Sequence, residues 1–255
     1  MIWFDHTAGK LIERIRVNAI SREVRDGRPF IVKRRRYTAW PLIRTANLFF
    51  RAAKNPAFVY ERASDWQRWE SGCFRMLHGD HFQVLVEGRR TVRAEVLPGR
   101  SLVGHLDSGT FSQPLVEAAG RELRRGHGMY SPEFRGAWSH GDPNLANFLF
   151  DTAEQRARMI DFEIIHHHSL PAVERHVADL LVFLQDLLGC VSGDDWLPFA
   201  HAFLSAYDCP EITPFLKREL VVPHGVPRVW WWIRSNYVSG QVLRERVDQL
   251  RESLS

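Results

Sequence analysis

Cysteine is scarce in this chain of 255 residues. The three cysteines, Cys73, Cys190 and Cys209, are odd in number, lie far apart and form no Cys-x-x-Cys pair. This pattern argues against a disulfide framework and against a thiolate zinc site, and it favours reduced thiols in a reducing compartment. Long apolar runs are missing as well, because no stretch approaches the roughly 20 apolar residues that span a bilayer.

The N-terminus lacks the pattern of a secretory signal. The first ten residues, MIWFDHTAGK, have no basic region followed by an apolar one. We therefore expect no cleaved signal. Together with the reduced thiols, this predicts a cytoplasmic protein.

Positive charge exceeds negative charge only slightly, and the excess is uneven. The formal net charge is +4, but RDGRPFIVKRRR (25–36) and RELRRGH (121–127) are densely basic. Two interpretations stay open for these stretches: a solvated face, or a surface that binds phosphates, nucleic acid or acidic lipid. No nucleic-acid-binding module is recognisable, so we expect no nucleic-acid partner.

The first third of the chain is typical of short strands. The stretches 11–20 and 29–35 flank the turn RDGR, which predicts a hairpin. Apolar residues at helical spacing predict a helix over 57–71 that ends at Gly72. Further strands are expected over 74–77, 82–88 and 91–97, and Pro98-Gly99 breaks the pattern.

Helical patterns dominate from about residue 101 onward. Helices are predicted over 112–125, 174–189 and 196–208. The exception is a hairpin predicted from the apolar runs NFLFD and ARMIDF around the turn TAEQR. Composition is that of an ordinary globular protein, with 45% hydrophobic and 25% charged residues. The fold class predicted is α+β, with a strand-rich half followed by a larger helical half.

Polar residues suited to chemistry concentrate in SHGDPNLANFLFDTAEQRARMIDFE (139–163). Asp142 and Asn147 have four residues between them, and Asp161 ends the next apolar run. Phosphoryl transfer needs a carboxylate for the acceptor hydroxyl, oxygen ligands for magnesium and a lysine for the phosphates. One shared phosphate site is the sharper interpretation, and two ordinary polar loops are the plainer one.

These motifs resemble those of protein kinases. His140-Gly141-Asp142 and Asn147 stand where HRD-x-x-x-x-N is found, and Asp161-Phe162-Glu163 stands where DFG is found. Supporting stretches are FIVKRRR, NPAFVYERASDWQRWESG, EVLPGRSL and RHVADLLVFL. Over about residues 20–185 the chain resembles the bacterial lipopolysaccharide kinase family, which phosphorylates Kdo or heptose of the inner core. It is also similar to aminoglycoside phosphotransferases and to compact protein kinases of the RIO type.

The resemblance implies a two-lobed protein-kinase-like fold. The N-lobe, residues 1–97, would be a small antiparallel sheet with one helix, and the C-lobe, residues 98–255, would be mainly helical. Asp142 would be the catalytic base, and Asn147 and Asp161 would hold Mg²⁺. A buried Asp179 would brace the catalytic loop. The tail after about residue 190 resembles the family little.

Nucleotide binding is the other implication of the resemblance. Lys33 would reach the ATP phosphates and pair with Glu61, for which Glu70 on the same predicted helix is a competitor. The backbone from Glu95 to Leu97 would meet the adenine edge. The expected cofactors are therefore ATP and Mg²⁺.

Three features depart from the protein-kinase pattern. Residues 12–24, expected to cover the phosphates, contain no glycine, and Glu163 replaces the motif glycine. No APE motif follows, and the segment after Glu163 is short, which argues against an extended peptide acceptor. A RIO-like protein kinase and a pseudokinase binding module remain as alternatives.

The expected acceptor is a sugar hydroxyl of a lipid-linked glycan. The basic and aromatic segment 34–56 predicts peripheral contact with anionic lipid at the inner face of the cytoplasmic membrane. For His166-His167-His168, a contact to substrate is preferred over a structural metal site. The run VWWWI (229–233) is interpreted as core packing, with an interfacial role as the alternative.

Overall fold

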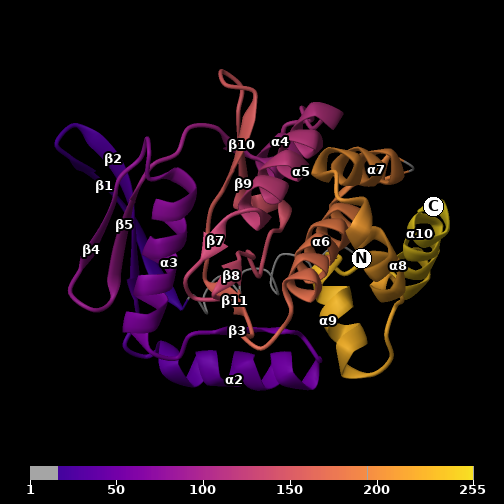
Figure 1. The fold of residues 1–255 in the computed structure, drawn as a ribbon, viewed down its shortest axis with the longest axis horizontal. Helices are drawn as coiled ribbons and strands as arrows, with labels where there is room; N and C mark the ends of the chain where they lie inside the picture. The colour runs from indigo at the N-terminus through magenta and orange to yellow at the C-terminus, as the bar shows by residue number, and fades with distance from the viewer. Residues whose placement is uncertain (1–16, 194, 255) are drawn as a thin grey trace, which may run out of the picture. The chain divides into compact units, whose positions relative to one another are not determined.

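The computed structural model describes residues 17–193 and 195–254. The chain divides into two compact units (Figure 1). The first unit comprises residues 17–49 and Val59–Val96, and the second comprises Phe50–Phe58 and residues 97–254. The structure is a mixture of antiparallel sheet and helices. The predicted phosphate-covering segment lies partly outside the described residues, since residues 12–16 are not among them.

A four-stranded antiparallel sheet forms the first unit. Its order is β1-β2-β5-β4, with β1 at Asn18–Arg25, β2 at Arg28–Arg35, β5 at Thr91–Glu95 and β4 at Val84–Glu87. The two-residue turn Asp26-Gly27 joins β1 to β2, with φ angles of 51° and 76°. Positive φ at both positions gives the hairpin turn that matches strand twist, which is why Asp-Gly is favoured there. The predicted turn and second strand are confirmed, whereas the first strand is Asn18–Arg25 and not 11–20, of which residues 11–16 lie outside the described residues.

Helix α3, Ala63–His78, packs on this sheet. It starts later than predicted and continues through Gly72, where an added Cβ would meet nothing within 4 Å. The predicted end at Gly72 and the predicted strand over 74–77 are both wrong. The buried residues Trp66, Cys73 and Leu77 repeat at helical spacing, so the apolar face itself carries the helix across the glycine.

The segment between β2 and α3 is more regular than the sequence suggests. It holds helix α2, Ala39–Ala52, and the short strand β3, Ala57–Val59. The side chain of Asn47 ties the two together, since its Nδ2 donates to the Val59 carbonyl at 2.9 Å and its Oδ1 accepts from the Val59 amide at 2.8 Å.

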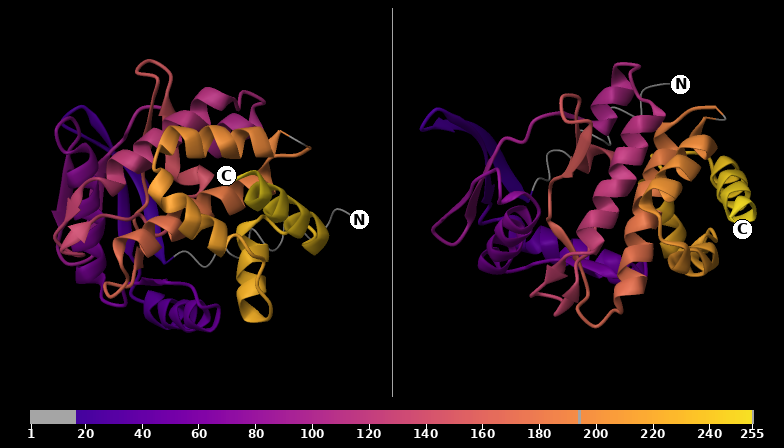
Figure 2. Two further views of the ribbon diagram at one scale, coloured as in Figure 1. Left: turned by 45° about the vertical axis from the view of Figure 1, so that its right-hand side comes forward. Right: turned by 45° about the horizontal axis from the view of Figure 1, so that its top comes forward.

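Helices make up most of the second unit. The predicted helices are confirmed as α5 (Gln113–His127), α6 (Ala172–Cys190) and α7 (Trp196–Tyr207). Figure 2 shows α5, in magenta, packed against α7, in orange. Gly120 permits this approach, because a Cβ there would lie 2.4 Å from the Phe203 carbonyl oxygen. Phe183 of α6 stacks on Phe203 with ring centroids 3.8 Å apart.

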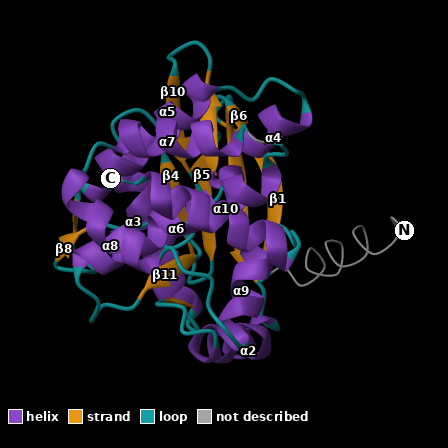
Figure 3. Cartoon of the chain, turned by 90° about the vertical axis from the view of Figure 1, so that its right-hand side faces the viewer, coloured by secondary structure: helices purple, strands orange, loops and turns teal. Residues whose placement is uncertain are grey.

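Smaller elements complete the second unit. In Figure 3, α6, α8 (Thr213–Glu219) and α10 (Gly240–Ser253) lie together on one side of it. The remaining elements are α4 (Leu102–Asp107), α9 (Val226–Arg234), the 3-10 helices Leu145–Asn147 and Pro210–Ile212, and the strands β6 (Arg100–Ser101), β7 (Tyr130–Ser131), β8 (Gly136–Ala137), β9 (Phe148–Asp151), β10 (Arg156–Met159) and β11 (Ile164–His166).

The hairpin predicted within the helical half is confirmed. Strands β9 and β10 pair antiparallel, with Phe148 opposite Met159, and β6 adds to β9. Among the described residues, none of the helices has the length and apolarity to cross a bilayer.

Candidate active site

Helix α6 supports the loop that carries Asp142 through hydrogen bonds. Asp179 of α6 is fully buried, and its Oδ2 and Oδ1 accept the backbone N–H groups of His140 and Gly141 at 2.7 and 2.8 Å. Two charge-assisted bonds from one carboxylate fix the peptide planes directly before Asp142. The predicted bracing role of Asp179 is confirmed.

Glycine is required at the centre of this loop. Gly141 has φ of +89°, and a Cβ there would lie 2.5 Å from the carbonyl oxygen of Ile164. A side chain would therefore clash with β11 as well as strain the backbone. Only glycine fits between His140 and Asp142, because this loop and β11 approach each other closely.

The β9–β10 hairpin brings Asn147 next to Asp161. The Ile160 N–H donates to the Asn147 carbonyl at 2.9 Å, and Asp161 follows directly. Asn147 also donates its side-chain Nδ2 to the Asp142 carbonyl at 2.8 Å. Because the amide nitrogen is engaged there, the amide oxygen points elsewhere and is suited to bind a cation.

The donor set formed by Asn147 and Asp161 fits a magnesium ion. Mg²⁺ prefers oxygen ligands and commonly takes one or two protein ligands together with substrate phosphates. Within the described residues there is no cluster of three or more His, Cys, Asp or Glu side chains that would hold a metal by itself. That Asn147 and Asp161 bind magnesium therefore stays a prediction, and the phosphates of a bound nucleotide would have to supply further ligands.

Asp142 has a partner that the sequence did not reveal. Its Oδ1 accepts a hydrogen bond from Nη1 of Arg234, the last residue of α9, and its Oδ2 accepts from Asn144 Nδ2 at 3.2 Å. The side chains of Arg234 and Asp142 are 10% and 19% exposed. The Arg234 guanidinium also lies 4.5 Å from the ring centroid of Trp230. A guanidinium from the C-terminal tail thus lies directly on the predicted base.

The end of α9 is anchored to the same helix that supports the loop. Asp186 of α6 accepts the Leu145 N–H at 2.7 Å through Oδ2 and the Asn236 side-chain amide at 2.8 Å through Oδ1. A Cβ on Gly189 would lie 2.3 Å from the Ser235 backbone, so α6 and this corner are in direct contact. Arg234 could not be found from motif spacing, because it lies 92 residues beyond Asp142.

In the first unit, Lys33 pairs with Glu70. Lys33 Nζ lies 2.5 Å from Glu70 Oε1, and their side chains are 14% and 7% exposed. The predicted partner Glu61 precedes α3 and is exposed, so the predicted Lys33–Glu61 pair is wrong. The physical reason is the later start of α3, which puts Glu70 on the helix face toward the sheet and leaves Glu61 in a loop.

Two backbone N–H groups of the predicted adenine-binding segment, Glu95 to Leu97, already donate hydrogen bonds to neighbouring segments. The N–H of Glu95 donates to the Gln83 carbonyl and that of Val96 to the Pro29 carbonyl, both at 2.9 Å. The Glu95 side chain pairs with Arg28 at 3.2 Å. A nucleotide base at this segment would therefore depend on its carbonyl groups and on Leu97, and that role stays a prediction.

Four buried histidines surround Asp179. His127 Nε2 lies 2.9 Å from Asp179 Oδ2, and its ring stacks on His176 at 3.8 Å. Burial lowers the pKa of His176 to about 3 and that of His166 to about 4. Burial also lowers the pKa of His140 and brings that of His127 well below its usual range. These rings are therefore neutral at physiological pH, and Asp179, which they surround, is fully buried.

The three histidines of the run 166–168 differ in burial. His166 is buried, and its Nδ1 lies 3.0 Å from Ser139 Oγ. His167 and His168 are both exposed and both lie against the ring of Phe58, with centroids 5.0 and 5.8 Å away, and His168 Nε2 lies 3.9 Å from Glu133. His166 is therefore part of the support of the loop 139–147.

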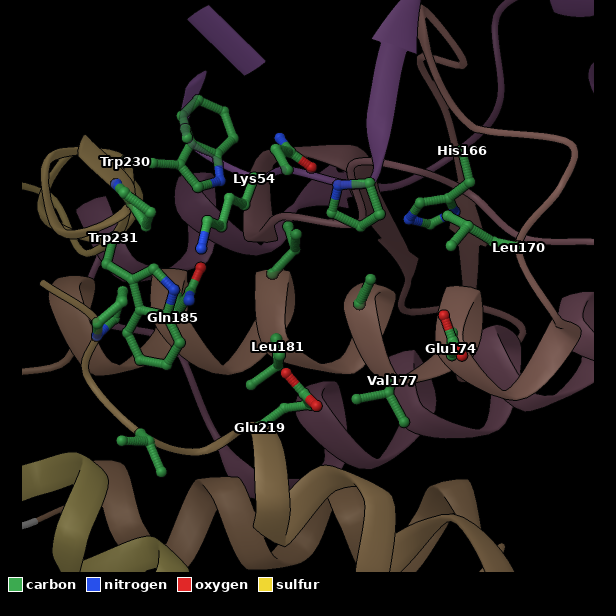
Figure 4. A pocket seen from close by; sticks show the side chains of 18 of the residues that line it. Lys54, His166, Leu170, Glu174, Val177, Leu181, Gln185, Glu219, Trp230 and Trp231 are labelled. Carbon is green, nitrogen blue, oxygen red and sulfur yellow. The ribbon is translucent and has the colours of Figure 1, made fainter. Parts of the chain in front are cut away.

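A cavity of about 760 Å³ lies within the second unit and borders the loop at Gly141. In Figure 4, Trp230, Trp231 and Lys54 lie at one end, and His166, Leu170 and Glu174 lie at the other, above α6. The predicted core role of VWWWI holds only in part: Trp231 is buried, Trp230 lines the cavity and Trp232 is 43% exposed.

Comparison with known proteins gives little beyond this geometry. The sequence matches no protein-family model and no curated protein. Among solved structures, an ethanolamine kinase from Plasmodium vivax is similar to this chain with a TM-score of 0.49 and 8% sequence identity. The similarity covers 93% of this chain and 79% of that one. It is too distant to carry an argument about function.

Proposed function

We propose that this chain is an ATP-dependent phosphotransferase of protein-kinase-like fold whose acceptor is an alcohol group. The observation that carries the proposal is the loop 139–147, in which Asp179 holds the backbone of His140 and Gly141 and so fixes Asp142. The part-buried Lys33–Glu70 pair supports it, since a lysine positioned by a helix glutamate is suited to bind nucleotide phosphates.

In the proposed reaction Asp142 orients the acceptor hydroxyl and receives its proton. The hydroxyl oxygen forms a bond to the γ-phosphorus of ATP, the bond from that phosphorus to the β–γ bridging oxygen breaks, and ADP leaves. Arg234 holds the Asp142 carboxylate in place, and Lys33 binds phosphate oxygens. Mg²⁺, held by Asn147 and Asp161, would neutralise charge on the phosphates.

The acceptor we propose is a sugar hydroxyl of the lipopolysaccharide inner core. The cavity beside Gly141 supports a compact acceptor, because it combines tryptophan faces with the carboxylates of Glu174 and Glu219. The segment between Glu163 and α6 is only residues 164–171, which leaves little chain for a peptide platform. The resemblance of HGDPNLANFL and IDFE to the family supports the same acceptor.

Contact with an anionic membrane belongs to this proposal. On α2, Trp40 and Leu48 are 50% and 57% exposed, and Arg44 lies on the same face at four-residue spacing. Aromatic, apolar and basic side chains on one helix face favour a membrane surface. This supports an acceptor that is lipid-anchored.

The test is phosphate transfer from γ-labelled ATP to inner-core glycolipid extracts, to simple sugars and to a general protein substrate. We expect labelled glycolipid, dependent on magnesium. Labelling of protein alone would favour a RIO-like kinase. Nucleotide binding without turnover on any acceptor would favour a pseudokinase.

A further inference from the structure

The first unit contains a recess with a strongly basic lining. Five arginines line this recess of about 380 Å³: Arg35, Arg36, Arg62, Arg89 and Arg90. Glu61 is the one acidic residue in its lining, so the recess has a net charge of +4. This equals the net charge of the whole chain. No aspartate or glutamate occurs in the sequence between Asp26 and Glu61.

Part of this recess is rigidly built. The Arg35 N–H donates to the Arg90 carbonyl at 2.9 Å, and the Arg90 guanidinium donates back to the Arg35 carbonyl. Arg90 stacks on Tyr37 with its guanidinium carbon 3.1 Å from the ring centroid, and Arg35 lies 4.5 Å from the Trp66 centroid. Stacking restrains a guanidinium and leaves its edge for hydrogen bonding. Two of the five arginines are therefore pre-positioned.

Two helices begin at the recess. Ala39, the first residue of α2, and Ala63 and Ser64, in the first turn of α3, belong to its lining. Arg62 occupies the N-cap of α3 and makes no side-chain capping bond, where Ser, Thr, Asp or Asn would. Helix N-termini attract anions through their free amide groups and the helix dipole. An arginine in place of a capping side chain adds positive charge where an anion is favoured already.

We propose that this recess is a binding site for a phosphomonoester group. A phosphomonoester carries a charge of about −1.5 to −2 at neutral pH and has three terminal oxygens for planar arginine donors. A phosphodiester has one charge and two such oxygens, so several converging arginines discriminate between the two. Tyr37 and Trp40 at the rim are 89% and 50% exposed, which favours a lipid-borne group over a free one.

This inference is independent of the proposed transfer reaction and goes beyond a general attraction to anionic lipid. None of the recess arginines belongs to the proposed catalytic residues. It also assigns a binding role to Arg35 and Arg36 of the basic stretch 25–36, for which the sequence left open a solvated face or a binding surface.

The test compares vesicles of matched surface charge. Phosphatidylcholine vesicles carry either phosphatidic acid, a phosphomonoester, or enough phosphatidylglycerol, a phosphodiester, to give the same zeta potential. Calorimetry with inorganic phosphate tests the free source. The 255-residue chain should bind the phosphatidic acid vesicles at least ~10-fold more tightly than the phosphatidylglycerol vesicles, because the effect of each nearby arginine grows with ligand charge. Binding to inorganic phosphate together with no binding to either kind of vesicle would support the site with a soluble ligand.

The decisive variant combines Arg36→Gln, Arg62→Gln and Arg89→Gln. All three side chains are exposed, so the fold should persist, as circular dichroism can verify. At roughly 5-fold per arginine near the ligand, the triple variant should lose on the order of 100-fold in affinity for phosphatidic acid vesicles. Its transfer activity toward a soluble acceptor should be unchanged.

A matched control removes the same charge elsewhere in the first unit. Arg22→Gln, Arg25→Gln and Arg68→Gln together change three exposed arginines outside the recess. The control should keep its preference for phosphatidic acid. Equal losses in the two triple variants, equal binding to both lipids, or equally tight binding to a phosphodiester oligonucleotide would overturn the proposal. Absence of binding to phosphate and to both vesicles would overturn it as well.

Discussion

Acidification below about pH 6.5 should destabilise this protein. The histidines around Asp179 are buried and neutral, and burial depresses the pKa of His166 to about 4 and of His176 to about 3. An unfolded histidine has a pKa near 6.5. Between pH 6.5 and the folded pKa, the unfolded chain therefore binds more protons than the folded one. Stability is fully present above pH 6.5 and is lost as pH falls through this window.

The size of the effect follows from linkage. At pH 5.0, each of these two histidines should reduce the free energy of unfolding by about 2 kcal/mol relative to pH 7.5. Together they remove about 4 kcal/mol, a large share of the 5–15 kcal/mol typical of a folded domain. His140 and His127 act in the same direction, because burial lowers their pKa values too.

Urea unfolding at several pH values measures this directly. Tryptophan fluorescence and circular dichroism should show a midpoint that falls steeply between pH 6.5 and 5.0. His176→Gln should reduce the loss between pH 7.5 and 5.0 by about 2 kcal/mol, whatever its effect at pH 7.5. The control His81→Gln, at an exposed position, should leave the pH dependence unchanged. A wild-type stability that is equal at pH 7.5 and 5.0 would refute the buried neutral cluster.

Three further predictions concern the candidate site. Asp161→Ala should weaken magnesium-dependent ATP binding more than Asn147→Ala, because a carboxylate gives a hard cation a full charge and an amide only a dipole. Calorimetry with Mg-ATP measures the two affinities, and wild-type affinity in both variants would place the metal elsewhere. Glu70→Gln should cost about 3 kcal/mol and lower transfer, because it removes the negative charge that lies 2.5 Å from Lys33 Nζ. Glu61→Gln should change stability by less than about 0.5 kcal/mol. The reverse order in urea unfolding would restore Glu61 as the partner. Arg234→Gln should lower kcat by up to ~100-fold with little change in ATP affinity, because Asp142 loses its orientation. Arg234→Lys should recover part of the rate, and an unchanged kcat in both variants would show that Arg234 does not act in the site.

Local patterns in the sequence were sufficient for much of the fold. The Asp26-Gly27 turn, the β9–β10 hairpin and the helices α5, α6 and α7 each follow from spacing or turn chemistry within one segment. The prediction failed where an element's boundary depended on packing. Helix α3 passes through Gly72 because its buried face continues, and this shift moved the lysine partner from Glu61 to Glu70.

Long-range contacts set the limit for the candidate site. The bracing role of Asp179 could be inferred from a resemblance, whereas Arg234 could not, since its tail carries no matching motif. Likewise, the sequence alone shows that the stretch 25–36 is basic. Only the fold shows that Arg62 and Arg89 line the same recess as Arg35 and Arg36. Residues far apart in the chain become neighbours through tertiary packing, which spacing alone does not encode.

The central claim is that Asp142 receives the proton of an acceptor hydroxyl during phosphate transfer from ATP. The most direct measurement compares the wild-type chain with Asp142→Asn for transfer of labelled phosphate to inner-core glycolipid, with ATP affinity measured alongside. We expect labelled glycolipid with the wild type, a rate about 10²–10⁴-fold lower with the variant, and nearly equal ATP affinity. Transfer by Asp142→Asn at the wild-type rate would show that Asp142 is not the base.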